Sequence, residues 1–319
     1  MGLILNAIDL ILIEKKKQNL NFSNKNILIM GYQDIYFTKE HLKKLFKFHS
    51  VENKFVKNST EENINLKDLF MDIGFKEIDI LDNSDYEGAN ILVNMNNLQN
   101  DVSLLKKYDF IFDWGTIEHV YNIPNYLNNI FNFLKKDGYY YGVTPMSGWV
   151  EHGFYQFSPV FFRDAFKHNW ETIFLKILNF KQNSPTGNWY ILSYDYSTMH
   201  QYAMGGFDNQ LYQNYFLFKK INSKKIDFDI QQSHFKNRWD NIEVSNKINN
   251  AEKKDIFKKG IKQKLKDKFV DILNRLFKLF GYKLNIKNIK KKPKEFDSIL
   301  KNYLELKINS YDKIDVNEK

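Results

Sequence analysis

Short apolar runs alternate with helical patterns through about the first 220 residues of the chain. Runs that are continuous, rich in β-branched or aromatic residues and bounded by Gly or polar residues predict buried strands. They are Asn26–Met30, Glu77–Leu81, Ile91–Val93, Tyr108–Trp114, Tyr139–Thr144, Glu171–Asn179 and Asn214–Lys220. Three- and four-residue apolar spacing predicts helices at Leu3–Ile13, Thr38–Phe48, Leu66–Ile73, Asn125–Lys136 and Pro159–His168. This alternation predicts an α/β fold whose mostly parallel sheet is covered by helices on both faces.

The predicted helices carry end signals. Thr38 and Ser158 are candidate N-caps, because a side-chain oxygen at that position can accept a bond from a free backbone amide. Gly74 and the pair Asp137-Gly138 are candidate stops. The connection Phe180–Gln213 is long and rich in Tyr, Asn and Gly. Connections of that length are usually functional or disordered, and the aromatic content of this one favours function.

The pattern changes after Ile221, where a polar stretch precedes a basic amphipathic segment. Apolar residues then recur at helical spacing between lysines, and the predicted helix ends at Gly281. The repeating apolar positions are Ile261, Leu265, Phe269, Ile272, Leu273, Leu276, Phe277 and Phe280. The sequence therefore predicts an α/β domain over residues 1–222, a linker over 223–260 and a basic helical tail over 261–319.

Charge is distributed unevenly between these parts. The whole chain has a formal net charge of +9, while residues 252–294 hold 16 Lys and Arg against four Asp and Glu. That segment alone is +12, which leaves −3 for the remainder. Three hypotheses follow for residues 261–294: packing on the domain or on a second copy, binding an anionic membrane surface, or binding nucleic acid. No nucleic-acid-binding motif supports the third.

Several classes of protein are excluded or disfavoured by the sequence. The chain has no cysteine, which rules out disulfides, thiolate metal sites and a Cys nucleophile. Leu3–Ile13 is short, contains Asp9 and is followed rather than preceded by lysines, unlike a secretory signal. No apolar run reaches the length of a membrane span. We expect a cytoplasmic protein, with peripheral attachment at the inner membrane face as an option.

Motifs for other chemistries are missing too. There is no Gly-x-Ser-x-Gly elbow and no phosphate-binding Gly-x-x-x-x-Gly-Lys loop. His119 and His152 are well separated, and no two histidines stand four residues apart on a helix. The sequence therefore predicts no metal site.

Candidate functional residues stand where predicted strands end, because parallel sheets bind ligands at the carboxyl ends of their strands. Gly31 follows the first strand, where a glycine allows close approach of a cofactor or simply ends the strand. Asp82 follows the second and could accept bonds from ribose hydroxyls. Asp79 and Asp85 are rivals for that role, and a solvated loop aspartate is the plain alternative.

Two further segments bring acid–base groups to the same edge. Asp113-Trp114-Gly115-Thr116-Ile117-Glu118-His119 ends the fourth strand and suits proton handling or a charged sulfonium. His152-Gly153-Phe154-Tyr155-Gln156-Phe157-Ser158-Pro159 follows the fifth and joins polar groups to aromatic rings, as a substrate pocket requires. The alternatives are a structural histidine at His119, a capping role for Glu118 and an aromatic packing loop.

Four segments carry a resemblance that covers about residues 25–220. They are Leu81-Asp82-Asn83-Ser84-Asp85-Tyr86-Glu87-Gly88-Ala89, Asn94-Met95-Asn96, Phe112-Asp113-Trp114-Gly115-Thr116-Ile117-Glu118-His119-Val120 and His152 to Pro159. In order and spacing they resemble a bacterial group of class I S-adenosylmethionine methyltransferase-like proteins that often occurs near surface-glycan genes. Here the acidic residue and further glycines of that group are absent around Gly31, and its Asp-Leu-Asn is Asn94-Met95-Asn96.

The resemblance implies a Rossmann-like methyltransferase fold with a seven-stranded sheet, the last strand antiparallel, and S-adenosylmethionine as cofactor. It implies these roles: Asp82 on the ribose, Asn94 near the adenine, Gly31, Asp113 and Gly115 at the methionine end, and His119, His152 and Tyr155 facing the acceptor. Glu118 completes the expected cofactor set, since its charge suits the sulfonium.

The function expected from the resemblance is methyl transfer to an oxygen or nitrogen of a small molecule or glycan, in surface polysaccharide synthesis. His119 or His152 is the expected base, because an imidazole titrates near neutral pH. Two alternatives stand beside it. One is a non-catalytic binding or scaffold protein with the same fold, favoured by the altered Gly31 region. The other is an RNA methyltransferase guided by the tail.

Overall fold

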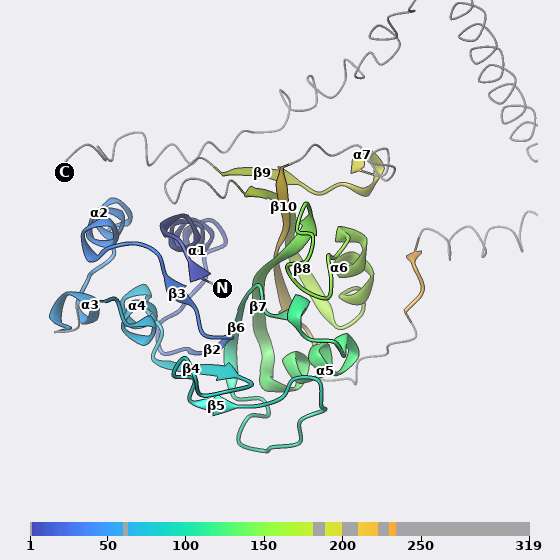
Figure 1. Ribbon diagram of the computed structural model, residues 1–319, viewed down its shortest axis with the longest axis horizontal. Helices are drawn as coiled ribbons and strands as arrows, with labels where there is room; N and C mark the ends of the chain where they lie inside the picture. Colours follow the sequence, from blue (N-terminus) through green and yellow to red (C-terminus); the bar gives the residue numbers. More distant parts are fainter. Residues whose placement is uncertain (1, 60–62, 181–188, 200–209, 223–229, 234–319) are drawn as a thin grey trace, which may run out of the picture. The chain divides into compact units, whose positions relative to one another are not determined.

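The central feature of the protein is an eight-stranded sheet with strand order β5-β4-β2-β6-β7-β10-β8-β9 (Figure 1). The computed structural model describes residues 2–59, 63–180, 189–199, 210–222 and 230–233. The strands are β2 Asn26–Met30, β4 Glu77–Asp82, β5 Ile91–Leu92, β6 Tyr108–Trp114, β7 Leu134–Ser147, β8 Trp170–Phe180, β9 Tyr190–Ser193 and β10 Leu211–Lys220. The predicted linker and tail lie outside the described residues, apart from 230–233.

Strand direction follows the predicted topology. Neighbours from β5 through β7 are parallel, whereas β10 is antiparallel to both β7 and β8. The seven predicted strands are all present, and the last of them in the chain is the antiparallel one. The sheet has one more strand than predicted, β9, which pairs antiparallel with β8 at the edge. The protein therefore has a Rossmann-like methyltransferase fold with one added edge strand.

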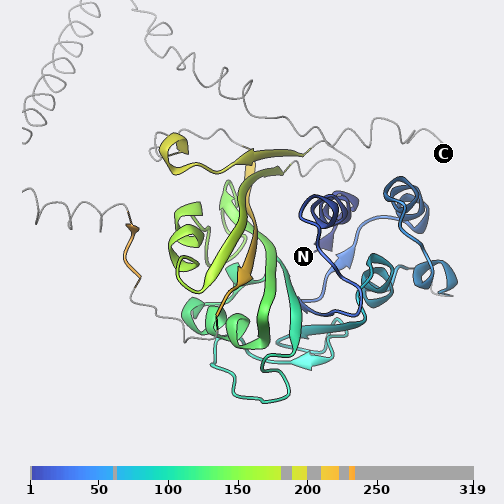
Figure 2. The same cartoon turned by 180° about the vertical axis from the view of Figure 1, so that it is seen from behind.

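Apolar residues alternate between the two faces of the sheet. In β2, Ile27 and Ile29 belong to one hydrophobic cluster, whereas Leu28 and Met30 belong to another. Helices α1 Leu5–Lys17, α2 Lys39–His49 and α4 Leu66–Ile73 contribute to the first cluster, and α5 Ile123–Phe133 and α6 Pro159–Ala165 to the second. The helices thus cover both faces, as the two opposite views show (Figures 1 and 2).

The predicted N-terminal helix exists as α1 and is buried along most of its length. Two of its acidic residues have basic partners: Asp9 contacts His49 at 2.6 Å, and Glu14 contacts Lys176 of β8 at 2.5 Å. Buried carboxylates require such partners, since an unpaired charge in the interior is very costly. Among the described residues, no helix is long and apolar enough to cross a membrane.

Helix ends follow local chemistry in most cases. The hydroxyl of Thr38 accepts a bond from the amide of His41 and caps α2 as predicted. Helix α4 has the predicted bounds, with Asn65 as its N-cap and Gly74 after its last residue. Ser158 does precede α6, but its side chain makes no capping bond, so that part of the prediction is wrong.

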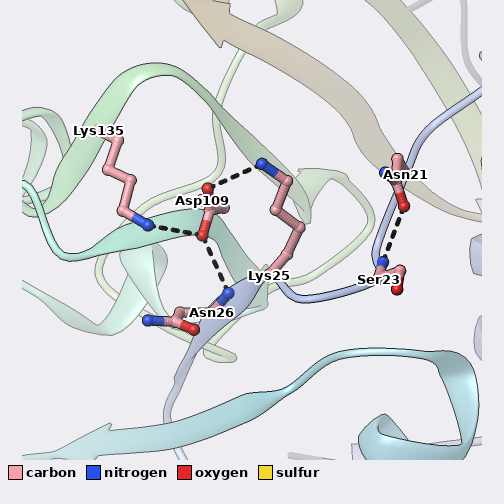
Figure 3. Close-up of polar contacts among 6 residues, drawn as sticks. All are labelled: Asn21, Ser23, Lys25, Asn26, Asp109 and Lys135. Carbon is pink, nitrogen blue, oxygen red and sulfur yellow. Dashed lines mark hydrogen bonds and ion pairs between the residues drawn. The ribbon is translucent and has the colours of Figure 1, made fainter.

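Two predicted helices end earlier than their periodicity suggested. Helix α5 ends at Phe133 rather than Lys136, because β7 begins at Leu134 and pairs with β6. Lys135 then donates to Asp109 of β6 at 2.9 Å, where Lys25 and the amide of Asn26 also donate (Figure 3). Strand pairing and this ion pair outweigh the helical spacing. Helix α6 ends at Ala165 rather than His168.

Some short elements had no sequence signal. They are β1 Gly2–Leu3, β3 Asp34–Ile35, α3 Phe55–Asn58, the 3₁₀ turn η1 Ile117–His119 and α7 Tyr196–Met199. Strands β1 and β3 form a separate two-stranded parallel sheet. The connection Phe180–Gln213, for which no helix or strand was predicted, contains β9 and α7.

Candidate functional site

The carboxyl ends of β2, β4 and β6 lie side by side at one edge of the sheet. Met30 of β2 pairs with Leu81 of β4 on one side and with Asp113 of β6 on the other. Gly31, which follows β2, and Asp82, the last residue of β4, are therefore brought together. This edge is where open parallel sheets bind their ligands.

Gly31 and Asp82 form the first half of the site. The amide of Gly31 donates to the carbonyl of Leu81 at 2.8 Å, which ties the turn after β2 to the end of β4. The carboxylate of Asp82 accepts from the amide of Tyr32 at 3.1 Å and from the amide of Asn83 at 2.6 Å. One bond on each oxygen fixes the half-buried carboxylate and leaves lone pairs for further donors.

The turn at Gly31 requires a glycine for two reasons. Its φ of +68° is strained for other residues. A Cβ there would also lie 2.8 Å from Oγ1 of Thr116, with Nε2 of Gln33 and Oδ2 of Asp82 at 3.7 and 3.9 Å. The Thr116 hydroxyl donates to the carbonyl of Met30 at 2.7 Å, which holds the segment after β6 against this turn.

Asn94 lies near Asp82, just beyond β5. Val93, the residue before it, donates its amide to the carbonyl of Asp82 at 2.9 Å. Asn94 is exposed, and its side-chain oxygen accepts bonds from the backbone and side-chain amides of Asn96. Its own side-chain NH₂ group remains available as a donor.

Asp113 is fully buried and its carboxylate is engaged by the protein itself. The hydroxyls of Tyr126 and Tyr140 donate to Oδ2 at 2.7 and 2.6 Å, and the amide of Thr116 donates to Oδ1 at 2.8 Å. Burial raises the pKa of the Asp113 carboxyl in spite of these bonds. Its side chain anchors the loop after β6, while the adjacent Gly115, with φ of +90°, turns the chain into η1.

Glu118 in η1 is equally buried but has the opposite surroundings. Neither of its carboxylate oxygens has a hydrogen-bond partner among the described residues. Burial, with the nearby Asp113 charge, raises the pKa of this carboxyl well above its usual range. The backbone carbonyl of Glu118 accepts from the amides of Phe154 and Tyr155 at 2.9 and 3.3 Å. The loop after β7 is thereby docked onto η1.

This docking brings His152 to Glu118 and to the neighbouring His119. Nε2 of His152 lies 3.8 Å from Oε1 of Glu118, and the His119 and His152 ring centroids are 5.2 Å apart. His119 is exposed and His152 half-buried. Burial lowers the pKa of both imidazoles, and for His119 the charge of His152 lowers it further. The lowered pKa values favour the neutral form of both rings.

Tyr155 lies at the rim of this cluster. Its hydroxyl donates to the carbonyl of Tyr121 at 2.8 Å, so its own lone pairs remain free to accept. The exposed rings of Tyr121 and Phe154 contact each other edge to face at 5.8 Å. The cluster thus has an aromatic border open to solvent.

No family model and no curated protein matches this sequence. Solved structures are similar in fold. Phosphoethanolamine N-methyltransferase 2 of Haemonchus contortus has 11% identity and a TM-score of 0.34, over 68% of this chain and 53% of that chain. Its phosphoethanolamine N-methyltransferase 1 has 11% identity and a TM-score of 0.32, over 71% and 45%.

Another similar structure is YcgJ of Bacillus subtilis, with 10% identity and a TM-score of 0.37 over 66% of this chain and 98% of that chain. The chain spans about half the length of the two Haemonchus enzymes, both of which contain S-adenosylhomocysteine. At these identities and TM-scores, the matches add nothing to the fold that strand order and direction establish.

Several residues of this edge were not predicted from the sequence. Gln33 is buried, its Oε1 has no partner among the described residues, and its Nε2 reaches the carbonyl of Met30 at 3.4 Å. Thr116, Tyr126 and Tyr140 organise the loop after β6. The one available signal was the position of Gln33 two residues after the strand-ending Gly31.

Proposed function

We propose that this protein is an S-adenosylmethionine-dependent methyltransferase that acts on an oxygen or nitrogen of a small-molecule or glycan acceptor. The observation that carries the proposal is the Asp82 carboxylate, fixed beside the Gly31 turn at the carboxyl edge of the sheet. A carboxylate at that position can accept hydrogen bonds from both hydroxyls of a ribose.

The chemistry of the neighbouring groups fits this cofactor. S-adenosylmethionine offers ribose hydroxyls and a cationic ammonium group, which both need hydrogen-bond acceptors. Asp82 has lone pairs to spare, and the buried Oε1 of Gln33 has no partner among the described residues. The free NH₂ group of Asn94 would serve the adenine. When bound, the cofactor supplies an electrophilic methyl group, so the protein mainly orients and deprotonates.

His119 and His152 would take the proton of the acceptor. Their lowered pKa values keep them uncharged at neutral pH, which is the state able to accept a proton. Tyr155 would orient the acceptor through its free lone pairs. The exposed rings of Tyr121 and Phe154 supply apolar surface beside these polar groups, as small-molecule sites generally have.

Calorimetric titration of the full chain with S-adenosylmethionine and S-adenosylhomocysteine tests the proposal. We expect micromolar binding that falls at least tenfold in Asp82→Ala. The matched control is Asp85→Ala, an exposed aspartate in the same segment, which should bind as the unchanged protein does. Binding that survives in Asp82→Ala, or is lost equally in Asp85→Ala, contradicts the assigned site.

A protein that binds neither compound, by heat or by thermal shift, would instead be the non-catalytic scaffold. With binding established, an acceptor screen among nucleotide sugars and glycolipids tests the glycan role. Radiolabelled methyl groups would show whether any of them is methylated. A product from an RNA substrate alone would favour the RNA methyltransferase.

We also propose that the basic tail places the protein at the inner membrane face. The proposal rests on the charge and apolar spacing of residues 261–294, which lie outside the described residues. The full chain should float with anionic phosphatidylglycerol vesicles at low salt and detach at high salt. Changing the four lysines within 262–268 to Gln should reduce flotation, whereas changing the exposed Lys43, Lys44 and Lys47 to Gln should not.

A further inference from the structure

Three metal-ligating side chains converge at the acceptor end of the site. One ligand atom from each of Glu118, His119 and His152 lies within 4.8 Å of the other two. Glu118 and His119 are consecutive, and the distant His152 joins them because the Glu118 carbonyl accepts from the amides of Phe154 and Tyr155 in the loop that carries it. Gly153 permits this contact, since a Cβ there would lie 3.0 Å from the carbonyl oxygen of Glu118.

The carboxylate of Glu118 gives an independent reason to expect a ligand. It is 0% exposed, and both of its oxygens lack a hydrogen-bond partner among the described residues, since His152 Nε2 stays 3.8 Å from Oε1. Leaving a buried carboxylate without a partner is unfavourable, and proteins usually avoid it by pairing or by metal coordination. The two imidazoles beside it offer ring nitrogens as ligand atoms. A bound cation would satisfy the carboxylate and use both rings.

We propose that Glu118, His119 and His152 bind one divalent transition-metal ion. Two imidazoles and one carboxylate form a ligand set that suits Zn²⁺ or Fe²⁺ and leaves at least one coordination position open. Metal–ligand distances of about 2.1 Å place tetrahedral ligand atoms roughly 3.4 Å apart, so the ligand atoms must approach one another by up to about 1.4 Å. The exposed ring of His119 and the half-buried ring of His152 have room to do so.

The role of the ion rests on the proposed function, whereas its binding does not. An open coordination position would take an acceptor hydroxyl. A coordinated hydroxyl has a lowered pKa, so its proton can pass to solvent water at neutral pH. In the metal-loaded protein the two imidazoles act as ligands, and the ion takes over from them the task of deprotonation.

Metal titration of the full chain, produced without a histidine tag and treated with chelator, tests the site. Calorimetry with Zn²⁺ should give one ion per chain, and Co²⁺ should produce visible absorption bands of a low-symmetry site. Glu118→Gln, His119→Ala and His152→Ala should each weaken Zn²⁺ binding at least tenfold. The exposed His168, changed to Ala, is the matched control and should leave binding unchanged.

The outcomes separate this inference from the proposed function. Asp82→Ala should lose S-adenosylmethionine binding and keep Zn²⁺ binding. His152→Ala should lose Zn²⁺ binding and keep S-adenosylmethionine binding. The metal site is overturned if stoichiometric Zn²⁺ binding is absent, persists in both Glu118→Gln and His152→Ala, or falls as much in His168→Ala. Cofactor binding without metal binding would leave the methyltransferase proposal standing. Thermal unfolding of each variant checks that a lost signal is not lost structure.

Discussion

Asp113 at the end of β6 and Glu118 in the turn that follows each have a buried carboxylate. The two carboxylates differ in their hydrogen bonding. Asp113 accepts bonds from two tyrosine hydroxyls and one backbone amide. Glu118 is buried to the same degree, yet neither oxygen has a partner among the described residues. Burial raises the pKa of both carboxyls, and the charge of Asp113 raises that of Glu118 further.

This contrast distinguishes a framework residue from a ligand-binding residue. A buried carboxylate with complete hydrogen bonding strengthens the native structure, because removing it would leave its partners unpaired. A buried carboxylate without partners weakens the free protein and gains its partner on binding. We therefore expect substitutions of Asp113 and Glu118 to change stability in opposite directions.

The largest expected effect is that of Asp113→Ala. The substitution leaves the hydroxyls of Tyr126 and Tyr140 and the amide of Thr116 without their acceptor in a sealed interior. We expect the free energy of unfolding to fall by about 3–5 kcal/mol, measured by urea denaturation. Asp113→Asn should lose less, because one oxygen remains to accept a tyrosine hydroxyl. A loss under about 1 kcal/mol for Asp113→Ala would contradict the assignment of Asp113 as a residue that stabilises the native structure.

Glu118→Gln should have the opposite effect and stabilise the metal-free protein. At pH 8, with chelator present, we expect the free energy of unfolding to rise by about 1–3 kcal/mol, because a buried Gln does not ionise. Glu14→Gln is the matched control, since Glu14 is also buried but has Lys176 as its partner. That change should destabilise the protein.

The pH dependence of the Glu118→Gln gain follows from its raised pKa. The unfolded carboxyl releases its proton near pH 4.5, whereas the folded one retains it to a higher pH. Over that interval the native state holds more protons, so the stability of the unchanged protein falls as pH rises. The advantage of Gln should therefore be near zero at about pH 4.5 and grow toward pH 8. Melting curves of both proteins across this range measure it, and a constant advantage would contradict the pKa shift.

The framework was predictable because local patterns determine it. The apolar runs of β2, β4 and β6 identify the central strands, and Asn65 and Gly74 set the ends of α4. Where one sequence pattern is compatible with both helix and strand, tertiary strand pairing determines which of them forms. Leu134–Lys136 fit a helical period, yet they form strand because β6 offers both backbone partners and the carboxylate of Asp109.

The location of the site at the carboxyl edge of the sheet was predictable, but the contacts among its side chains were not. Strand ends identify Gly31 and Asp82, because parallel strands bring their carboxyl ends together. The sequence does not show that Tyr126 and Tyr140 would satisfy Asp113, or that a distant loop would bring His152 to Glu118. Those contacts depend on side-chain directions and on loop docking, which have no sequence period.

The smallest expected effect concerns Thr116, which links the Gly31 turn after β2 to the Asp113 end of β6. Thr116 joins them, since its amide donates to Asp113 and its hydroxyl donates to the Met30 carbonyl at 2.7 Å. Thr116→Val keeps the shape and removes only the hydroxyl bond, so we expect a loss of about 1 kcal/mol in unfolding free energy. Thr116→Ser retains the donor and should lose less. If Thr116→Val keeps full stability while Thr116→Ser loses it, packing of the Thr116 methyl group, rather than the hydrogen bond, joins β6 to β2. If Thr116→Val also weakens S-adenosylmethionine binding while Thr116→Ser does not, the same bond holds the Gly31 turn in its ligand-binding form.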